Sequence, residues 1–387
     1  MADDRRQVIL LTGATGAIGR ELLARMVRVP NTRVICLVRA KTDEEAASRL
    51  SATLDELAYH ALSGEERSRI SALRGDITQE RMGLDTAKWE ALAEQTTRIV
   101  HGAANVSWSL PLEDARRINV FGTGELLRLG EAAYRRGTLR AFDYLGTVMV
   151  AGKRQGLIGE EELDEKLGFW STYEQSKAEA ERTVRARRGT LPISIFRLSM
   201  VVGDSRTGHT SSFNVMYWPL KMLSRGMFWI APADPQGVVD VVPVDYATDA
   251  VEALSRDPGQ RGKCFHIAAG PQNCCTVSEF LDLAVEVMRI RRPLLVNPAV
   301  FFALVKPLIL TVTWGKRREA FHKARVYVPY LSYHARFDDT QARTALEPLG
   351  LRPPLVSTYF RNLINYAVAT DWGKRRLQVS TVGSDSR

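Results

Sequence analysis

The first half of the chain alternates short apolar runs, rich in β-branched residues, with longer amphipathic stretches. Short β-branched runs predict strands, and the amphipathic stretches between them predict helices. Strands that alternate with helices build a parallel sheet through right-handed crossovers. We predict strands near 7–12, 33–38, 70–75, 97–103, 139–147 and 192–198, with helices near 17–29, 43–60, 86–95, 112–137 and 171–188.

This alternation loosens after about residue 204, where a polar loop and an apolar aromatic stretch precede a strand over VVDVV, a short helix from Asp245 and a strand over KCFHIAA. A chain of 387 residues also exceeds the size at which a single core stops growing. We therefore expect an α/β fold, a doubly wound parallel sheet with a smaller, mainly helical C-terminal lobe. The expected division is a sheet domain over 1–204, with core strands to about 270, an interleaved lobe over 205–376 and a flexible tail over 377–387.

A glycine-rich turn lies between the first predicted strand and the helix that follows it. It reads Thr12-Gly13-Ala14-Thr15-Gly16-Ala17-Ile18-Gly19, in the strand-to-helix context that a dinucleotide site requires. Gly13 permits the tight turn, Gly16 lets the backbone approach a pyrophosphate, and Gly19 lets helix and strand pack closely. The helix N-terminus offers unpaired N–H groups to the anion. We expect cofactor contacts at Gly13, Thr15, Gly16, Ala17, Ile18 and Gly19, a purely structural turn being the alternative.

The second predicted strand ends in Cys36-Leu37-Val38-Arg39. An NAD site usually carries an acidic residue here, about 20 residues beyond the last glycine, to bind the ribose diol. Arg39 can instead fork around a 2′-phosphate and stack on adenine. The sequence therefore favours NADPH over NADH, with a solvated surface arginine as the alternative.

Two further strand ends supply candidate cofactor contacts. Gly75-Asp76-Ile77 places the Asp76 carboxylate where it could accept from the adenine amino group, with Ile77 against the ring. The small residues Ala103, Ala104 and Asn105 would let the cofactor lie close to the backbone. We leave His101 out of the catalytic set, because a histidine inside an apolar strand is more often a structural group.

The candidate catalytic residues are Thr147, Tyr173 and Lys177. On a helix, the four-residue spacing puts Tyr173 and Lys177 on one face, with Cβ atoms about 5–6 Å apart. We expect the ammonium to lower the phenol pKa from its ordinary value near 10 toward the working range, while Lys177 also contacts the cofactor ribose. Thr147, at the end of strand five, can hydrogen-bond a carbonyl oxygen as negative charge develops. A solvated helix face is the alternative for the pair alone.

The four cysteines follow no disulfide or zinc spacing, so we expect no metal. The formal charge is +9, and the excess basic residues cluster late in the chain. Such clusters suit acidic partners or an anionic surface. The N-terminal segment enters a strand too soon for a signal peptide, which predicts a cytoplasmic protein. We expect no nucleic-acid partner, and the sequence leaves the oligomeric state open.

The most apolar stretch of the chain covers residues 294–314. Asn297, Pro298, Lys306 and Pro307 interrupt it, which disfavours a membrane-spanning helix. Two interpretations stay open, a buried helix of the lobe, which we favour, and peripheral membrane contact through the basic-flanked region 289–325.

With these motifs the chain resembles the extended short-chain dehydrogenases. Further stretches are similar to the branch of fatty acyl-CoA reductases and thioester reductases, the male-sterility type: CLVRA at 36–40, RGDITQERMGLDTAKWEAL at 74–92, IVHGAANVSW at 99–108, RRINVFGTGELLRL at 116–129 and RLSMVVGDSRTG at 197–208. The resemblance implies a Rossmann-type fold and assigns the cofactor to Gly13, Gly16, Gly19, Arg39, Asp76, Ile77, Ala103 and Asn105, and the chemistry to Thr147, Tyr173 and Lys177.

The resemblance also implies an activity, NADPH-dependent reduction of an acyl thioester to the aldehyde, with a second step to the alcohol left open. The acyl group would arrive on coenzyme A or a carrier protein. The family's Ser-Thr pair at the end of strand five reads Gly146-Thr147 here, so one hydroxyl is missing. Action on a free carbonyl or hydroxyl, of a sugar nucleotide, a steroid-like substrate or a 3-keto lipid, is the alternative. A non-catalytic redox sensor is disfavoured because Tyr173 and Lys177 are both present.

Overall fold

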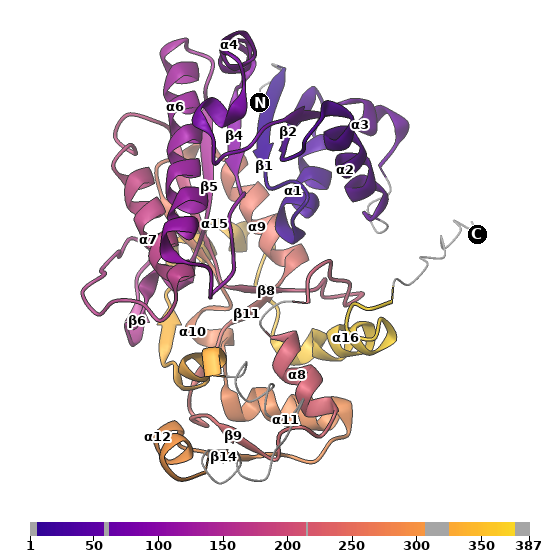
Figure 1. Cartoon of the computed structure of the whole chain (residues 1–387), viewed down its shortest axis with the longest axis vertical. Helices are drawn as coiled ribbons and strands as arrows, with labels where there is room; N and C mark the ends of the chain where they lie inside the picture. The colour runs from indigo at the N-terminus through magenta and orange to yellow at the C-terminus, as the bar shows by residue number, and fades with distance from the viewer. Residues whose placement is uncertain (1–5, 58–61, 214–215, 306–324, 376–387) are drawn as a thin grey trace.

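The protein is built around a central sheet of seven parallel strands, in the order β12-β7-β5-β4-β1-β2-β3 (Figure 1). The computed structural model describes residues 6–57, 62–213, 216–305 and 325–375. The strands are β1 (Gln7–Thr12), β2 (Thr32–Val38), β3 (Ile70–Arg74), β4 (Arg98–His101), β5 (Ala141–Thr147), β7 (Ile193–Leu198) and β12 (Cys264–Ile267). The order reverses between β1 and β4, which makes a crevice at their carboxyl ends. The predicted α/β Rossmann-type fold is confirmed.

Helices cover both faces of the sheet (Figure 1). The alternation within β1 shows why, since Ile9 and Leu11 join one buried cluster and Val8 and Leu10 join the other. The first cluster includes α1 (Ala17–Val27), α2 (Asp43–Asp55), α9 (Val244–Arg256) and α15 (Thr340–Leu346), and the second includes α4 (Thr86–Gln95), α6 (Gly122–Arg135) and α7 (Thr172–Arg185).

One predicted helix, 112–137, is interrupted in the structure. It consists of α5 (Leu112–Arg116), a π-helical turn over Arg117–Phe121 and then α6. The turn carries Asn119, whose buried side chain bonds to two neighbouring segments. A π turn adds one residue to the helical repeat and redirects a side chain, and helices often carry such turns at functional sites.

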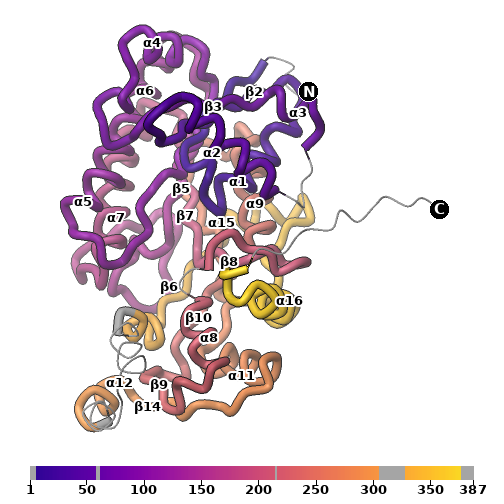
Figure 2. Tube along the Cα trace, turned by 45° about the vertical axis from the view of Figure 1, so that its right-hand side comes forward, coloured from indigo at the N-terminus to yellow at the C-terminus, as the bar shows by residue number. Residues whose placement is uncertain are grey.

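The C-terminal lobe lies at one end of the molecule in both views (Figures 1 and 2). Its main helices and strand pairs are α8 (Tyr217–Ser224), α11 (Val277–Met288), α16 (Val356–Ala369), β9 (Ile230–Pro232) with β14 (Leu294–Val296), and β10 (Val238–Val239) with β13 (Cys275–Thr276). Yet α9 and α15 pack on the sheet, and β12 is one of its strands, although all three come from 205–376. The expected domain boundary stays a prediction, and the expected tail over 377–387 lies outside the described residues.

The apolar stretch 294–314 is described only in part. Residues 294–296 form strand β14, which pairs in parallel with β9. The prediction of a helix is therefore wrong for these three residues. A short helix follows over Pro298–Val300 (α12). Residues 306–314 and most of the basic segment after them lie outside the described residues. Across the residues that are described, no helix is both long and apolar enough to cross a bilayer.

A buried ion network joins the sheet to α9. The Arg98 guanidinium donates to Asp143 at 2.7 Å and lies 3.1 Å from Glu252, and the Arg98 side chain is 2% exposed. Removing one partner of such a group leaves the others buried without compensation, which is strongly destabilising.

We predict that Arg98→Met lowers the free energy of unfolding by about 3–5 kcal/mol, because two buried carboxylates lose their cation. The control is Arg67→Met, whose pair with Asp55 is 40% and 64% exposed and should contribute less than about 1 kcal/mol. Urea unfolding of both variants checks this. Equal losses for the two would contradict it.

Candidate active site

Three of the predicted segments meet where the strand order reverses. The glycine turn follows β1, residues 103–105 follow β4, and Thr147 ends β5. These strands are neighbours in the sheet, with Thr12 paired to His101 and His101 to Tyr144. Parallel neighbours end at the same edge, so the three segments form one crevice.

The glycine turn has the backbone that its sequence predicts. Gly13 has a φ of +79°, and a Cβ there would lie 2.7 Å from the carbonyl carbon of Gly102. A Cβ on Gly19 would lie 2.1 Å from the Gly13 oxygen. Gly16 is exposed, and no side chain of the described residues caps α1 there. The first N–H groups of α1 are therefore open to an anion, which fits a dinucleotide pyrophosphate beside Thr15, Ala17 and Ile18.

The other candidate cofactor residues lie along the same edge. Arg39 is exposed at the end of β2, and residues Ala103, Ala104 and Asn105 are half-buried. The Asp76 carboxylate accepts from the Thr78 N–H at 2.9 Å and hydroxyl at 2.8 Å. Ile77 is buried against Gly122 of α6. Their contacts with adenine and ribose stay predictions.

His101 is a structural group. Its Nδ1 lies 2.8 Å from the Thr12 hydroxyl and its Nε2 lies 3.0 Å from the Thr123 hydroxyl. Thr123 donates its own proton to the Asn119 carbonyl, so it accepts from Nε2. Burial lowers the pKa of His101 to about 3, and the imidazole is neutral at physiological pH.

Thr147 and Tyr173 lie close together. The Thr147 hydroxyl is near enough to the Tyr173 phenol to lower its pKa, and Thr147 Oγ1 accepts from the Met149 N–H at 3.2 Å. Ser171 caps α7 by accepting from the Glu174 N–H, which fixes Tyr173 in the first turn of the helix. Thr147 is buried and Tyr173 is half-buried. They come from two different elements, the end of β5 and the start of α7.

The expected lowering of the Tyr173 pKa is wrong for this structure. Burial raises the pKa of Tyr173 to about 12, although the bond to Thr147 opposes the shift. The Lys177 ammonium donates instead to the Leu145 carbonyl at 3.0 Å and lies 4.4 Å above the centre of the Tyr144 ring. Burial lowers the pKa of Lys177 to about 8. The phenol therefore keeps its proton at neutral pH, as a proton donor requires.

Asn119 is a site residue that the sequence did not reveal. Its side chain donates to the Ser176 hydroxyl at 2.9 Å and accepts from the Asn105 N–H at 2.8 Å. It therefore ties the loop after β4 to the helix that carries Tyr173. Its position depends on the π turn, which the helical pattern of the sequence does not show.

Glu174 connects α7 to the lobe. Its carboxylate accepts from the Trp170 N–H at 2.8 Å and from the hydroxyl of Tyr330. Burial raises the pKa of Glu174. Tyr330 packs in turn against Trp108, with ring centres 4.3 Å apart and the ring planes tilted by 38°. The lobe segment over Arg325–Ser332 is thus held against the residue next to Tyr173.

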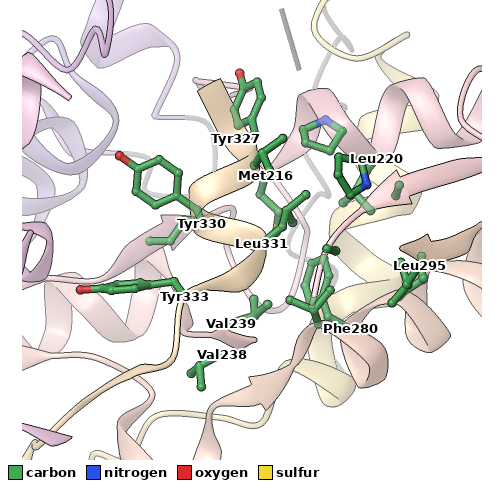
Figure 3. A pocket seen from close by; sticks show the side chains of 18 of the residues that line it. Met216, Leu220, Val238, Val239, Phe280, Leu295, Tyr327, Tyr330, Leu331 and Tyr333 are labelled. Atoms are coloured by element: carbon green, nitrogen blue, oxygen red, sulfur yellow. The ribbon is translucent and has the colours of Figure 1, made fainter. Parts of the chain in front are cut away.

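An apolar cavity of about 310 Å³ begins beside this contact. It is lined by Val148 and Met149, the two residues after Thr147, and it extends into the lobe. Figure 3 shows Tyr327, Tyr330 and Tyr333 on one side of it and Leu295 on the other.

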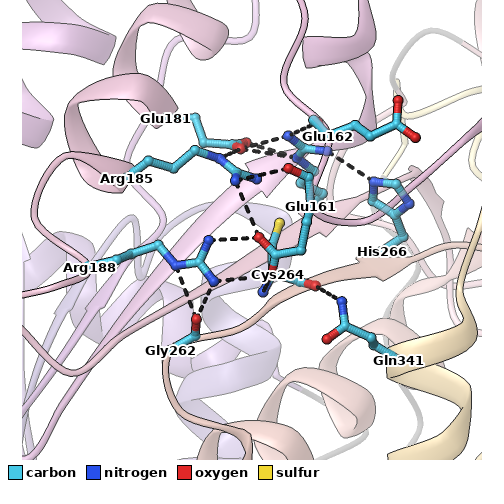
Figure 4. Close-up of polar contacts among 10 residues, drawn as sticks. Glu161, Glu162, Glu181, Arg185, Arg188, Gly262, Cys264, His266 and Gln341 are labelled. Carbon is cyan, nitrogen blue, oxygen red and sulfur yellow. Dashed lines mark hydrogen bonds and ion pairs between the residues drawn. The ribbon is translucent and has the colours of Figure 1, made fainter.

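A buried polar cluster fixes the far half of α7 (Figure 4). Glu181, one turn beyond Lys177, accepts from Arg185 and Arg197, each at 2.7 Å. Burial would raise the pKa of Glu181, but Arg197 holds it below its ordinary value. His266 accepts from Arg197 at 3.2 Å and donates to the Asp338 carbonyl at 2.8 Å, and burial lowers its pKa to about 3. The cluster therefore positions the helix that carries Lys177.

The fold and the crevice define an NAD(P)-dependent reductase of the short-chain dehydrogenase type. Residues 11–251 match the family model described as male sterility protein, and this chain belongs to that family. The family that the sequence motifs predicted is thus confirmed. Within the described residues, no cluster of three or more metal-ligating side chains occurs.

The relatives include proteins that are much longer than this chain. The chain is 31% identical over 268 residues to a linear gramicidin synthase protein of Brevibacillus parabrevis, which covers 67% of this chain and 5% of that protein. It is 29% identical over 311 residues to a carboxylic acid reductase of Mycobacterium marinum, covering 73% of this chain and 26% of that protein. The chain therefore spans a small part of these relatives.

Solved structures of other proteins superpose on nearly the whole of this chain. The terminal R domain of the myxalamid biosynthetic pathway superposes with a TM-score of 0.82 at 28% identity, covering 97% of this chain and 94% of that one. UDP-glucuronic acid 4-epimerase of Bacillus cereus superposes with a TM-score of 0.64 at 16% identity, covering 95% and 100%, which shows the shared fold alone.

We predict that kcat/KM of the reductase falls as the pH rises through about 8, because Lys177 then loses its proton. Below that pH the ammonium persists. Lys177→Arg keeps a charged group at all accessible pH values, so its residual activity should lack this alkaline decline. The measurement is the pH profile of kcat/KM for both proteins, and an unchanged decline in the variant would assign it to another group.

Proposed function

We propose that this chain is an NADPH-dependent reductase that converts acyl thioesters to aldehydes. The observation that carries the proposal is that the neighbouring hydroxyls of Thr147 and Tyr173 lie beside an apolar cavity of about 310 Å³. The pair can hold a carbonyl oxygen, and the cavity offers room for an acyl substituent but few partners for a polar one. The 28% identity to an R domain over nearly full length supports a substrate bound to a carrier.

The cofactor residues are proposed as follows. The N–H groups at Ala17 and Ile18 hold the pyrophosphate, because no side chain of the described residues caps the start of α1. Arg39 binds the 2′-phosphate of NADPH from its exposed position at the end of β2. When bound, the cofactor supplies the hydride to the carbonyl carbon.

The chain's own residues then handle the oxygen and the proton. Thr147 donates a hydrogen bond to the carbonyl oxygen as it gains negative charge. Tyr173, protonated at neutral pH, gives its proton to that oxygen, and the product of this step is a thiohemiacetal. When the thiohemiacetal collapses, its carbon–sulfur bond breaks, the hydroxyl proton passes to the leaving sulfur, and the aldehyde and the free thiol are released. Lys177 lies behind them with its charge available to the ribose. At Gly146 the chain lacks the second hydroxyl of the family pattern, so Thr147 acts without it.

We propose coenzyme A or an acyl carrier protein as the donor of the acyl group. The test is NADPH oxidation with a panel of acyl-CoAs, ketones and sugar nucleotides. Oxidation with thioesters, accompanied by thiol release, supports the proposal. Oxidation with ketones or sugar nucleotides alone would replace it by a reductase of free carbonyls.

We predict that Tyr173→Phe lowers kcat by about 10²- to 10⁴-fold, because the proton donor is lost, while Kd for NADPH is unchanged. The matched control is Tyr134→Phe on α6, where the tyrosine is 48% exposed and away from the crevice. Stopped-flow turnover and NADPH fluorescence titration measure the two quantities. Wild-type turnover in Tyr173→Phe would remove Tyr173 from the mechanism.

We predict that Arg39→Ala reduces the preference for NADPH over NADH by about 10- to 100-fold, because charged hydrogen bonds to the 2′-phosphate are lost. Arg33→Ala is the control, since Arg33 is also exposed on β2 but near the opposite end of the strand. The ratio of kcat/KM for the two cofactors checks this. An unaltered ratio would mean that Arg39 is a surface residue.

A further inference from the structure

Four of the polar side chains that line the cavity already have partners within the protein. Tyr333 donates to the Gly152 carbonyl at 2.9 Å, and Tyr330 donates to Glu174. Ser199 donates to the Asp240 carbonyl at 2.8 Å. The Asp240 carboxylate accepts from the backbone N–H groups of Ala269 and Gly270. Few groups are left to replace the water that a polar ligand would lose on entering.

The remaining wall is almost entirely hydrocarbon and aromatic. Phe280 and Ala284 of α11, Leu295 of β14 and Phe301 face the cavity from the lobe. Burying an amide or hydroxyl against such a wall is unfavourable without a hydrogen-bond partner, whereas burying methylene groups is favourable. The cavity therefore discriminates by polarity.

The cavity also has a direction. One side is attached to the catalytic residues, because Val148 and Met149 follow Thr147 and Tyr330 is bonded to the neighbour of Tyr173. Leu295 lies on the opposite side (Figure 3). A substrate whose carbonyl contacts Thr147 would extend its acyl chain toward Leu295.

We propose that the acyl group is a long hydrocarbon chain, and that Leu295 is a specificity-determining residue that limits its length. The proposal rests on the proposed function and names its substrate class. Several relatives are named as peptide synthetases. In this chain the wall favours an aliphatic chain over a peptidyl group of the same length.

Strand β14 offers a matched pair of substitutions. Successive residues of a strand point to opposite sides, and Leu294 is 63% exposed whereas Leu295 lines the cavity. Leu295→Trp fills the cavity and Leu295→Ala enlarges it. Leu294→Trp adds the same bulk outside.

The experiment measures kcat/KM with acyl-CoAs from butanoyl to hexadecanoyl, and the melting temperature of each variant. Leu295→Trp should lose roughly tenfold or more on the long chains and keep its activity on butanoyl-CoA, because a few methylenes in an apolar pocket have this effect. Leu295→Ala should shift the optimum to longer chains, and Leu294→Trp should match the wild type. Two results would overturn the assignment. One is that Leu295→Trp lowers kcat/KM equally for all chain lengths while Leu295→Ala leaves the preferred length unchanged. The other is that Leu294→Trp changes the preferred length as Leu295→Trp does.

A binding measurement separates this inference from the proposed function. Calorimetric titration of the wild-type protein with dodecanoate should give binding, and dodecanedioate, with a second carboxylate at the far end, should bind at least tenfold more weakly. If dodecanoate binds selectively but no thioester is reduced, the proposed function fails and the hydrocarbon site stands. If short acyl-CoAs are reduced and the two acids bind alike, the inference fails and the proposed function stands.

Discussion

The contact between α7 and β5 is the constraint on which the site depends. The Lys177 ammonium donates to the Leu145 carbonyl and lies over the Tyr144 ring, so the helix is fixed against the strand that ends in Thr147. That contact places Tyr173 near enough to Thr147 for the Thr147 hydroxyl to lower the Tyr173 pKa. Glu181, one turn farther along α7, anchors the same helix through Arg197. A shift of α7 would separate the two hydroxyls.

The site has two parts with different requirements, the sheet edge and the lobe. The sheet edge needs an exposed backbone at Gly16, which comes from local structure, and a protonated phenol at Tyr173, which comes from burial. The lobe needs only shape and low polarity to receive an acyl group. The bond between Glu174 and Tyr330 links them, because it holds a cavity wall against the residue beside the catalytic phenol. Chemistry and substrate selection are therefore adjacent but rest on separate elements.

Much of this arrangement was predictable from local sequence. Strand periodicity predicted the sheet, and the glycine turn and the Tyr173–Lys177 spacing each follow from a few neighbouring residues. The rest depends on distant packing. Asn119 reaches Ser176 only because of a π turn, and Tyr330 meets Glu174 across a separation of 156 residues. The raised pKa of Tyr173 follows from burial, which spacing along a helix cannot report.

Isotope transfer tests the central claim of thioester reduction most directly. The protein is incubated with dodecanoyl-CoA and NADPH deuterated at nicotinamide C4, using each stereoisomer in turn, and the aldehyde is trapped as a hydrazone for mass spectrometry. One stereoisomer should give an aldehyde with a single deuterium on its carbonyl carbon, together with free coenzyme A. Absence of labelled aldehyde with both stereoisomers, while a ketone is reduced to labelled alcohol under the same conditions, would contradict the account.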